Sequence, residues 1–335
     1  MLVARICQVS FAPVLKAAPT RFQLIRPSGP KSIFRTFADE SRNSFQERLA
    51  RRRTLRERAM APAGETAFDI GKGALAGGSA LGLGALCYYG LGLSKQAGIA
   101  DQYALWPDYV KKRVHATYMY FGGSLVITAA AAAATLRSPT LMNLMTRSSF
   151  LALAGSLAAM MGSGMIVQSL PYKEGFGAKQ LAWIVHASIL GAVVAPVCLM
   201  GGPVVTKAAW YTLGIVGGLS TIAVCAPSGK FLTMAGPLAI GLGTVFIASI
   251  GSFFLPPTSV LGAGLYSLSV YGGLLLFSGF LLYDTHRIVH VAENYPAMMN
   301  PPYDPINACL SIYLDVVNIF IRMVMILGGG GNRKK

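Results

Sequence analysis

Charged and apolar residues alternate in long blocks, so that the chain consists of long uncharged runs separated by short polar segments. Six runs of more than twenty residues contain no Asp, Glu, Lys or Arg: 73–94, 114–136, 148–172, 180–206, 208–229 and 231–283. A helix needs about 20 apolar residues to cross the hydrocarbon core of a bilayer. Each run is therefore long enough for at least one transmembrane helix.

The longest run predicts two helices rather than one. Pro256 and Pro257 interrupt it, and proline blocks helix continuation and removes a backbone donor. Another apolar segment follows close to the C-terminus. We therefore expect an all-α polytopic bundle of seven to eight transmembrane helices joined by short connections, with a compact core. The expected spans are 74–94, 117–136, 148–168, 181–201, 207–226, 234–255, 261–284 and 305–327.

Composition points to the same class of protein. The mean hydropathy is +0.52, 53% of the residues are hydrophobic and only 13% are charged, about half the charged fraction of a typical soluble domain. The five cysteines are far apart and form no CxxC pair, so neither a zinc site nor a redox motif is indicated. We expect a membrane protein that is not an enzyme, holds no organic cofactor and has the lipid bilayer as its first partner.

Positive charge is concentrated at the N-terminus. Residues 1–60 hold thirteen Lys or Arg and four acids, and the whole chain carries a net charge of +16. An Arg-rich, acid-poor segment without an apolar core is typical of an organelle transit peptide. The alternatives are docking of a basic tail on anionic lipid and nucleic-acid binding, which we do not expect because the basic residues are not interleaved with aromatic ones.

This pattern gives a domain plan. We predict a mitochondrial transit peptide at 1–45, a basic matrix-side segment at 46–73, the transmembrane domain at 74–328 and a basic tail at 329–335.

Two carboxylates lie in apolar surroundings and are the main candidates for function. They are Asp284, at the end of the seventh span, and Asp315, inside the last. An ionisable group inside a bilayer costs at least about 2.5–3.5 kcal/mol on insertion scales. In the last span, Ser311, Asn318 and Arg322 are spaced to share one helical face with Asp315, as a period of 3.6 residues requires. Such a polar stripe should face the protein interior or a water-filled cavity.

The spacing of the two aspartates permits a pair. The helix-breaking cluster Asn300-Pro301-Pro302 lies midway between Asp284 and Asp315. If the two helices form an antiparallel hairpin, both carboxylates lie roughly 12–15 Å from the turn, at 1.5 Å per residue. They would then reach a similar depth in the membrane. The alternative is structural, with each Asp capping or hydrogen bonding a neighbouring helix.

A carboxylate pair in a low-dielectric interior favours sharing a proton, because the two like charges repel. A hard cation such as Ca²⁺ prefers carboxylate and carbonyl oxygen, and its binding displaces the proton. This competition is the minimum requirement for Ca²⁺/H⁺ exchange or for a pH-gated Ca²⁺ leak. Asn318 and Ser311 would supply neutral oxygens beside Asp284 and Asp315.

Other polar residues have two interpretations each. His186 lies within the fourth span, where it would relay protons or pack as a neutral side chain. His286 and His290 are four residues apart, as on a metal-binding helix face, but they follow the apolar stretch and are expected on a solvated helix extension. Arg137 flanks the second span, where it would anchor the helix at the interface or reach a carboxylate.

The segment Ala263–Val324 resembles the Bax-inhibitor family of multi-span membrane proteins. The resemblance is carried by Tyr266-Ser267, by Leu282-Tyr283-Asp284 and by the string Leu310-Ser311-Ile312-Tyr313-Leu314-Asp315-Val316-Val317-Asn318-Ile319-Phe320. The basic N-terminus, the run Gly82–Leu93 and the ending Gly331-Asn332-Arg333-Lys334-Lys335 are similar to the mitochondrial branch of that family.

The resemblance implies a bundle whose last helix is surrounded by the others. It implies that Asp284 and Asp315 form a pH-sensitive calcium site, and that the protein conducts or exchanges Ca²⁺ against H⁺ and restrains apoptosis. A basic latch on the aspartates is also implied. Arg137 is the nearest match by position, and Arg322 and His186 are further candidates for a latch or relay.

For the mitochondrial branch, the resemblance implies a multi-pass protein of the inner membrane that supports cristae organisation and cytochrome c retention. Cytochrome c and inner-membrane complexes would then be partners. The alternative function is a non-transporting scaffold that shapes cristae and retains cytochrome c without moving ions.

Overall fold

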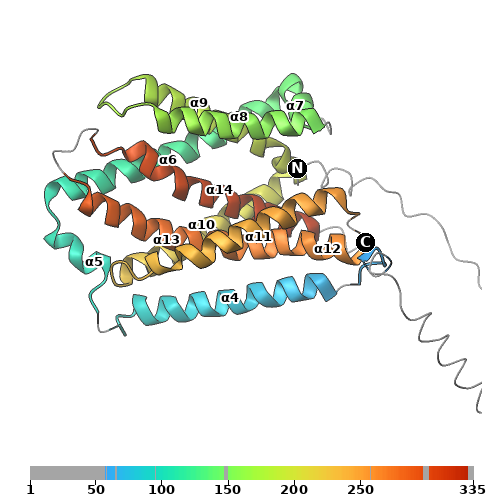
Figure 1. The fold of residues 1–335 in the computed structure, drawn as a ribbon, viewed down its shortest axis with the longest axis horizontal. Helices are drawn as coiled ribbons and strands as arrows, with labels where there is room; N and C mark the ends of the chain where they lie inside the picture. The colour runs from blue at the N-terminus through green and yellow to red at the C-terminus, as the bar shows by residue number, and fades with distance from the viewer. Residues whose placement is uncertain are drawn as a thin grey trace, which may run out of the picture.

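A computed structural model describes residues 57–330, except 58, 65, 95, 147–149, 257 and 297–301. The predicted transit peptide, residues 46–56 of the basic segment, Asn300 and Pro301 of the helix-breaking cluster, and residues 331–335 lie outside the described residues. The described chain forms a helical bundle (Figure 1). Its α-helices are α4 (Thr66–Gly90), α5 (Ile99–Gln102), α6 (Asp108–Arg137), α7 (Pro139–Thr146), α8 (Phe150–Ser169), α9 (Ala178–Val194), α10 (Gly202–Cys225), α11 (Ala235–Phe254), α12 (Val260–Ser267), α13 (Gly273–Asn294) and α14 (Pro305–Gly330). Short helical turns are η1 (Tyr103–Leu105), η2 (Ala195–Met200), η3 (Leu232–Met234) and the π-helix η4 (Leu268–Gly272).

The predicted all-α architecture is confirmed. Within the described part of the chain, seven helices are long and apolar enough to cross a membrane. They are Thr66–Gly90, Asp108–Arg137, Ala178–Met200, Gly202–Cys225, Leu232–Phe254, Val260–Asn294 and Pro305–Gly329. The predicted span 148–168 corresponds to α8, an apolar helix of 20 residues that packs against α9 and is not one of the seven.

The last helix, α14, lies at the centre, as the resemblance implied. It packs against α6, α10 and α13, and Figure 1 shows it between α6 and α13. Its inward residues form much of the core, among them Ile312, Val316, Ile319 and Val324. A largely apolar helix is suited to this position, because most of the surface of α14 packs against other helices.

Side-chain hydrogen bonds join α6 both to α14 and to α9. The hydroxyl groups of Tyr313 and Thr128 are 2.5 Å apart, and the Thr128 hydroxyl is also 3.3 Å from the carbonyl of Ala187 on α9. The indole of Trp183 on α9 donates to the Ser124 hydroxyl on α6 over 2.7 Å. Hydrogen bonds of this kind stabilise helix contacts in membranes, where apolar burial alone gives no preference for protein over lipid.

One long span contains a change of helix type. α12, η4 and α13 follow one another without a break from Val260 to Asn294, and η4 is a π-helix of five residues. Its Ser269 hydroxyl is 2.6 Å from that of Ser249 on α11. A π-helical turn contains an extra residue, and such turns occur frequently at functional sites.

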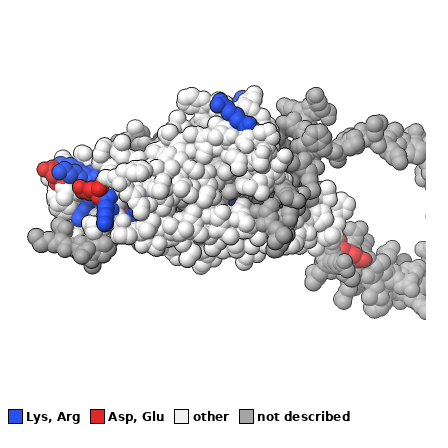
Figure 2. Space-filling model, turned by 90° about the horizontal axis from the view of Figure 1, so that it is seen from above, with Lys and Arg blue, Asp and Glu red and all other residues white. Residues whose placement is uncertain are grey.

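Charged side chains gather at one end of the bundle (Figure 2). The α8–α9 connection, with the exposed Lys173 and Glu174, lies at this end, as does the first turn of α6 with Asp108. Apart from a basic group at its upper edge, the middle of this face is without charges. A broad uncharged surface of this kind is what the hydrocarbon core of a bilayer requires.

The contact between α6 and α9 provides a stability test. A methyl group at Gly191 would lie 2.5 Å from the Thr128 carbonyl oxygen and 2.7 Å from the Ala131 side chain. We expect Gly191→Ala to separate α9 from α6 and to lower the free energy of unfolding by about 1–3 kcal/mol, the usual cost of overpacking. The measurement is the thermal unfolding midpoint in detergent.

The matched control is Gly214→Ala on α10, where nothing lies within 4 Å of an added methyl group. It should leave the midpoint unchanged or raise it, because alanine has the higher helix propensity. Equal midpoints for both variants would contradict the close approach of α6 and α9.

Candidate ion site

The two predicted aspartates meet in the middle of the bundle. Asp284 on α13 is 4% exposed and Asp315 on α14 is 5% exposed. Their carboxyl groups lie within hydrogen-bonding reach of each other. One Asp315 oxygen, Oδ2, is buried without a hydrogen-bond partner in the protein. A buried carboxylate oxygen without a donor is costly, so this atom is available to a proton or a cation.

Two further side chains contact the pair from its solvent side. The Ser311 hydroxyl, one turn before Asp315, lies within hydrogen-bonding reach of Asp284. The guanidinium of Arg287, one turn after Asp284, lies 3.6 Å from the Asp284 Oδ1, and its side chain is 55% exposed. Arg287 therefore provides positive charge at the edge of the pair while it remains hydrated.

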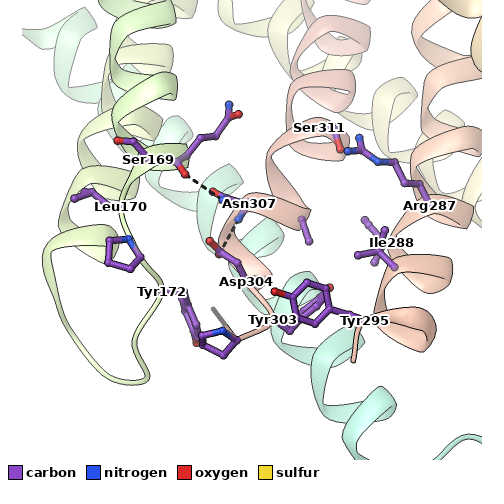
Figure 3. Close-up of a pocket in the computed structure, with 15 residues that line it drawn as sticks. Ser169, Leu170, Tyr172, Arg287, Ile288, Tyr295, Tyr303, Asp304, Asn307 and Ser311 are labelled. Carbon is purple, nitrogen blue, oxygen red and sulfur yellow. Dashed lines mark hydrogen bonds between the residues drawn. The ribbon is translucent and has the colours of Figure 1, made fainter. Parts of the chain in front are cut away.

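A cavity of about 480 Å³ leads to this edge. It lies between the end of α8, the second half of α13 and the start of α14 (Figure 3). In Figure 3, Arg287 extends from α13 toward Ser311 of α14. The lining residues are Gln168, Ser169, Leu170, Pro171, Tyr172, Arg287, Ile288, Val291, Tyr295, Pro302, Tyr303, Asp304, Asn307, Ala308 and Ser311. Ser311 and Arg287 contact both the cavity and Asp284, so the cavity extends from one end of the bundle to the residues beside the aspartates.

A buried lysine holds the wall of the cavity in place. Lys179, at the start of α9, is 2% exposed and pairs with the Asp304 carboxylate. Its ammonium also donates to the Asn307 side chain at 3.0 Å and to the Leu170 carbonyl at 2.8 Å. Asp304 in turn accepts from the backbone N–H groups of Ile306 and Asn307, both at 3.0 Å. The first turn of α14 is thus capped by a carboxylate that is fixed to the α8–α9 connection.

The α13–α14 turn is fixed to α6 in a similar way. The Arg113 guanidinium donates to the carbonyls of Ala292 and Tyr295 at 3.0 and 2.8 Å, which satisfies the C-terminal end of α13. The Tyr303 hydroxyl is 2.8 Å from that of Thr117. Burial raises the pKa of the Tyr303 phenol above its ordinary value, so this cavity residue stays neutral at physiological pH.

Comparison with known proteins identifies the family of this chain. The family described as "Inhibitor of apoptosis-promoting Bax1" matches residues 110–333, which include both aspartates and the cavity. The chain belongs to the Bax-inhibitor family.

Individual relatives extend over different lengths. The rat "Growth hormone-inducible transmembrane protein" is 50% identical over the whole chain and 97% of the relative. A membrane protein of Vibrio cholerae is 31% identical over 63% of this chain and 86% of its own. The bovine "Bax inhibitor 1" is 25% identical over 54% of this chain and 75% of its own.

Asn318 and Arg322 contact each other rather than the aspartates. The Arg322 guanidinium donates to the Asn318 side-chain oxygen at 2.8 Å and to the Asn318 carbonyl at 3.1 Å. The Asn318 side-chain oxygen, which the sequence predicts as an ion ligand, therefore already accepts a hydrogen bond from Arg322. Of the neutral oxygens predicted for this Bax-inhibitor site, Ser311 is the one that contacts the pair.

The other two candidates for a latch or relay lie elsewhere. Arg137 is exposed at the last residue of α6, about 13 Å along that helix from Thr128, which marks the level of Tyr313. The His186 Nδ1 lies 2.8 Å from the Ser163 hydroxyl and joins α9 to α8. Within the described residues, no hydrogen bond or ion pair joins either side chain to the aspartates. The basic side chain that contacts the pair is Arg287, which the sequence did not single out.

One expectation was wrong. His286 was expected on a solvated helix extension with His290, but it is 1% exposed. Its Nε2 donates to the Ala223 carbonyl of α10 at 2.9 Å, and its ring packs edge-on against Phe231. The helix extension itself exists, but this face of α13 packs against α10.

Among the described residues, no cluster of three or more His, Cys, Asp or Glu could hold a metal ion.

The Lys179 contacts can be tested directly. Removing one partner of a buried ion pair leaves the other charge without compensation and costs about 3–5 kcal/mol. We expect Lys179→Met to destabilise the protein by an amount near the lower end of this range, since Asp304 is still partly hydrated. Thermal unfolding in detergent measures the change.

Lys173→Met is the matched control, because Lys173 is exposed in the same connection. Its unfolding midpoint should equal that of the wild type. A Lys179→Met midpoint that also equals the wild type would contradict the structural role of the ion pair.

Proposed function

We propose that this Bax-inhibitor protein moves Ca²⁺ across a membrane in exchange for H⁺, or as a pH-gated leak, at the pair Asp284 and Asp315. The observation that carries the proposal is the position of these two buried carboxylates, which lie within hydrogen-bonding reach of each other and next to Arg287 and Ser311, two residues that line a cavity. A carboxylate pair sealed in the bundle would favour a structural role. A pair that a cavity reaches can exchange protons and cations with solution.

The ligand set fits transport better than storage. High-affinity Ca²⁺ sites use six to eight oxygens with several carboxylates, whereas Asp284, Asp315 and Ser311 supply fewer, so water must complete the shell. A transported ion has to bind well enough to enter and weakly enough to leave. When Ca²⁺ binds, it neutralises both carboxylates, and the proton that they share leaves to solution.

Arg287 determines the resting state of this proposed site. Its guanidinium near Asp284 already compensates part of the negative charge. An entering Ca²⁺ therefore has to displace both the shared proton and Arg287. Because the Arg287 side chain is half exposed, it can swing into the cavity without leaving water.

The cellular setting is also part of the proposal. The basic, acid-poor N-terminus supports import into mitochondria, and the similarity to the mitochondrial branch of the family supports the inner membrane. The description of the family, an inhibitor of apoptosis-promoting Bax1, supports a role in restraining apoptosis. In this setting, Ca²⁺/H⁺ exchange would support cristae organisation and cytochrome c retention.

The deciding experiment is Ca²⁺ flux into proteoliposomes that contain the purified full chain, driven by an imposed pH gradient. We expect flux in the wild type and loss of at least nine-tenths of it in Asp284→Asn and Asp315→Asn, since amides keep the shape but cannot bind a proton or a cation by charge. Asp108→Asn, an exposed aspartate on α6, is the control and should keep wild-type flux.

Absence of flux from folded wild-type protein would overturn the transport proposal and favour the non-transporting scaffold. Unchanged flux in both aspartate variants would remove the pair from the pathway.

A second variant tests the role of Arg287. Neutralising the cation near Asp284 should strengthen Ca²⁺ binding, because Ca²⁺ no longer competes with a resident positive charge. We expect Arg287→Gln to lower the half-saturating Ca²⁺ concentration several-fold, a moderate effect because Arg287 is partly screened by water. Lys173→Gln, an exposed cation at the same end, should leave it unchanged. A higher half-saturating concentration would contradict this role.

A further inference from the structure

Arg322 brings a second positive charge close to the aspartates, from the side opposite the cavity. It lies seven residues after Asp315 on α14, which corresponds to about 10 Å along the helix axis. The cavity is lined by the second half of α13 and the first half of α14. Arg322 instead lies against Gly273 and Phe277, in the first half of α13.

The guanidinium is held in place without an acidic partner. It lies 4.4 Å from the centre of the Phe277 ring, an arrangement that stabilises a cation on an aromatic face. Its Nη1 donates twice to Asn318, while its Nε is buried without a partner. No ion pair involves Arg322 within the part of the chain that the structure describes. A partly buried cation that is not neutralised by a carboxylate projects its charge onto its surroundings.

The backbone of α13 makes room for this side chain. A methyl group at Gly273 would overlap the guanidinium, so only glycine leaves space for it there. Gly273 directly follows the π-helix η4. A glycine, an aromatic ring and an amide thus form a receptacle for one guanidinium group between α13 and α14.

We propose that Arg322 is a positively charged plug that closes the ion pathway on the side of the aspartates away from the cavity. A cation that reaches Asp315 from the cavity meets a fixed positive charge two turns further along α14. In a low-dielectric interior, the repulsion between a divalent and a monovalent cation at this separation is a barrier to passage. The proposal rests on the transport function above and adds the element that prevents an open leak.

The plug also separates exchange from leak. With Arg322 in its receptacle, Ca²⁺ and protons exchange at the aspartates from the cavity side alone. Passage to the other side requires the guanidinium to leave Gly273 and Phe277, which couples release to a rearrangement of the first half of α13.

The test is passive Ca²⁺ flux through the full-length protein in proteoliposomes without a pH gradient. We expect Arg322→Gln to raise this flux at least tenfold above the wild type. Arg322→Lys keeps the charge and should stay at the wild-type level, which a role in packing alone does not predict. Lys207→Gln removes an exposed cation from α10 and is the control for loss of positive charge elsewhere.

The pathway is checked by combining variants. If the leak passes through the aspartates, Arg322→Gln combined with Asp284→Asn and Asp315→Asn should return to the wild-type passive level. A leak that persists in this triple variant would overturn the plug, because ions would then bypass the site. Gly273→Ala, which displaces the guanidinium while keeping its charge, should also leak, and it decides the question if Arg322→Gln does not fold.

The outcomes separate this inference from the proposed function. Gradient-driven flux in the wild type with no added leak in Arg322→Gln overturns the plug and leaves transport standing. A leak in Arg322→Gln from a wild type that shows no gradient-driven flux supports the plug and overturns exchange. Absence of flux in every folded variant overturns both.

Discussion

The constraint on which the rest of the structure depends is the burial of two carboxylates between α13 and α14. Each costs at least about 2.5–3.5 kcal/mol to place inside a bilayer, and the pair is stable only if the helices that carry it cannot slide or splay. The central position of α14 meets this need, because α6, α10 and α13 surround it. The polar contacts of the bundle serve the same purpose.

Those contacts concentrate on the turn between the two helices. Lys179 fixes Asp304 at the start of α14, Thr117 contacts Tyr303, and Arg113 holds the end of α13. Two helices far from the hairpin in sequence, α6 and α9, thereby set its register. The register of the two helices is fixed at the turn. Because each aspartate lies about ten residues from the turn along its own helix, Asp284 and Asp315 reach the same depth.

Much of this arrangement could be predicted from the sequence. The uncharged runs gave the spans, because the length of a membrane helix is set by the bilayer. The position of Asn300-Pro301-Pro302 between the aspartates showed that the two could reach the same depth and form a pair. The supporting residues could not be found in this way. Lys179 stands at the edge of an apolar run, and its burial depends on the α8–α9 connection folding over it. Similarly, His286 follows charged and polar neighbours, and its burial depends on where α10 lies.

The π-helix η4 has a consequence for how this chain can change in length. In a regular α-helix, loss of one residue rotates everything that follows it by about 100°. A π-helical turn already holds one residue more than an α-helical turn, so loss of a single residue between Leu268 and Gly272 would convert η4 to an α-helix and leave α13 nearly unrotated. The same loss between Gly273 and Asp284 would carry Asp284 away from Asp315, although neither aspartate would be altered. Within this long span, η4 is therefore the place where the chain can shorten by one residue without dismantling the centre of the protein, 12 residues before Asp284.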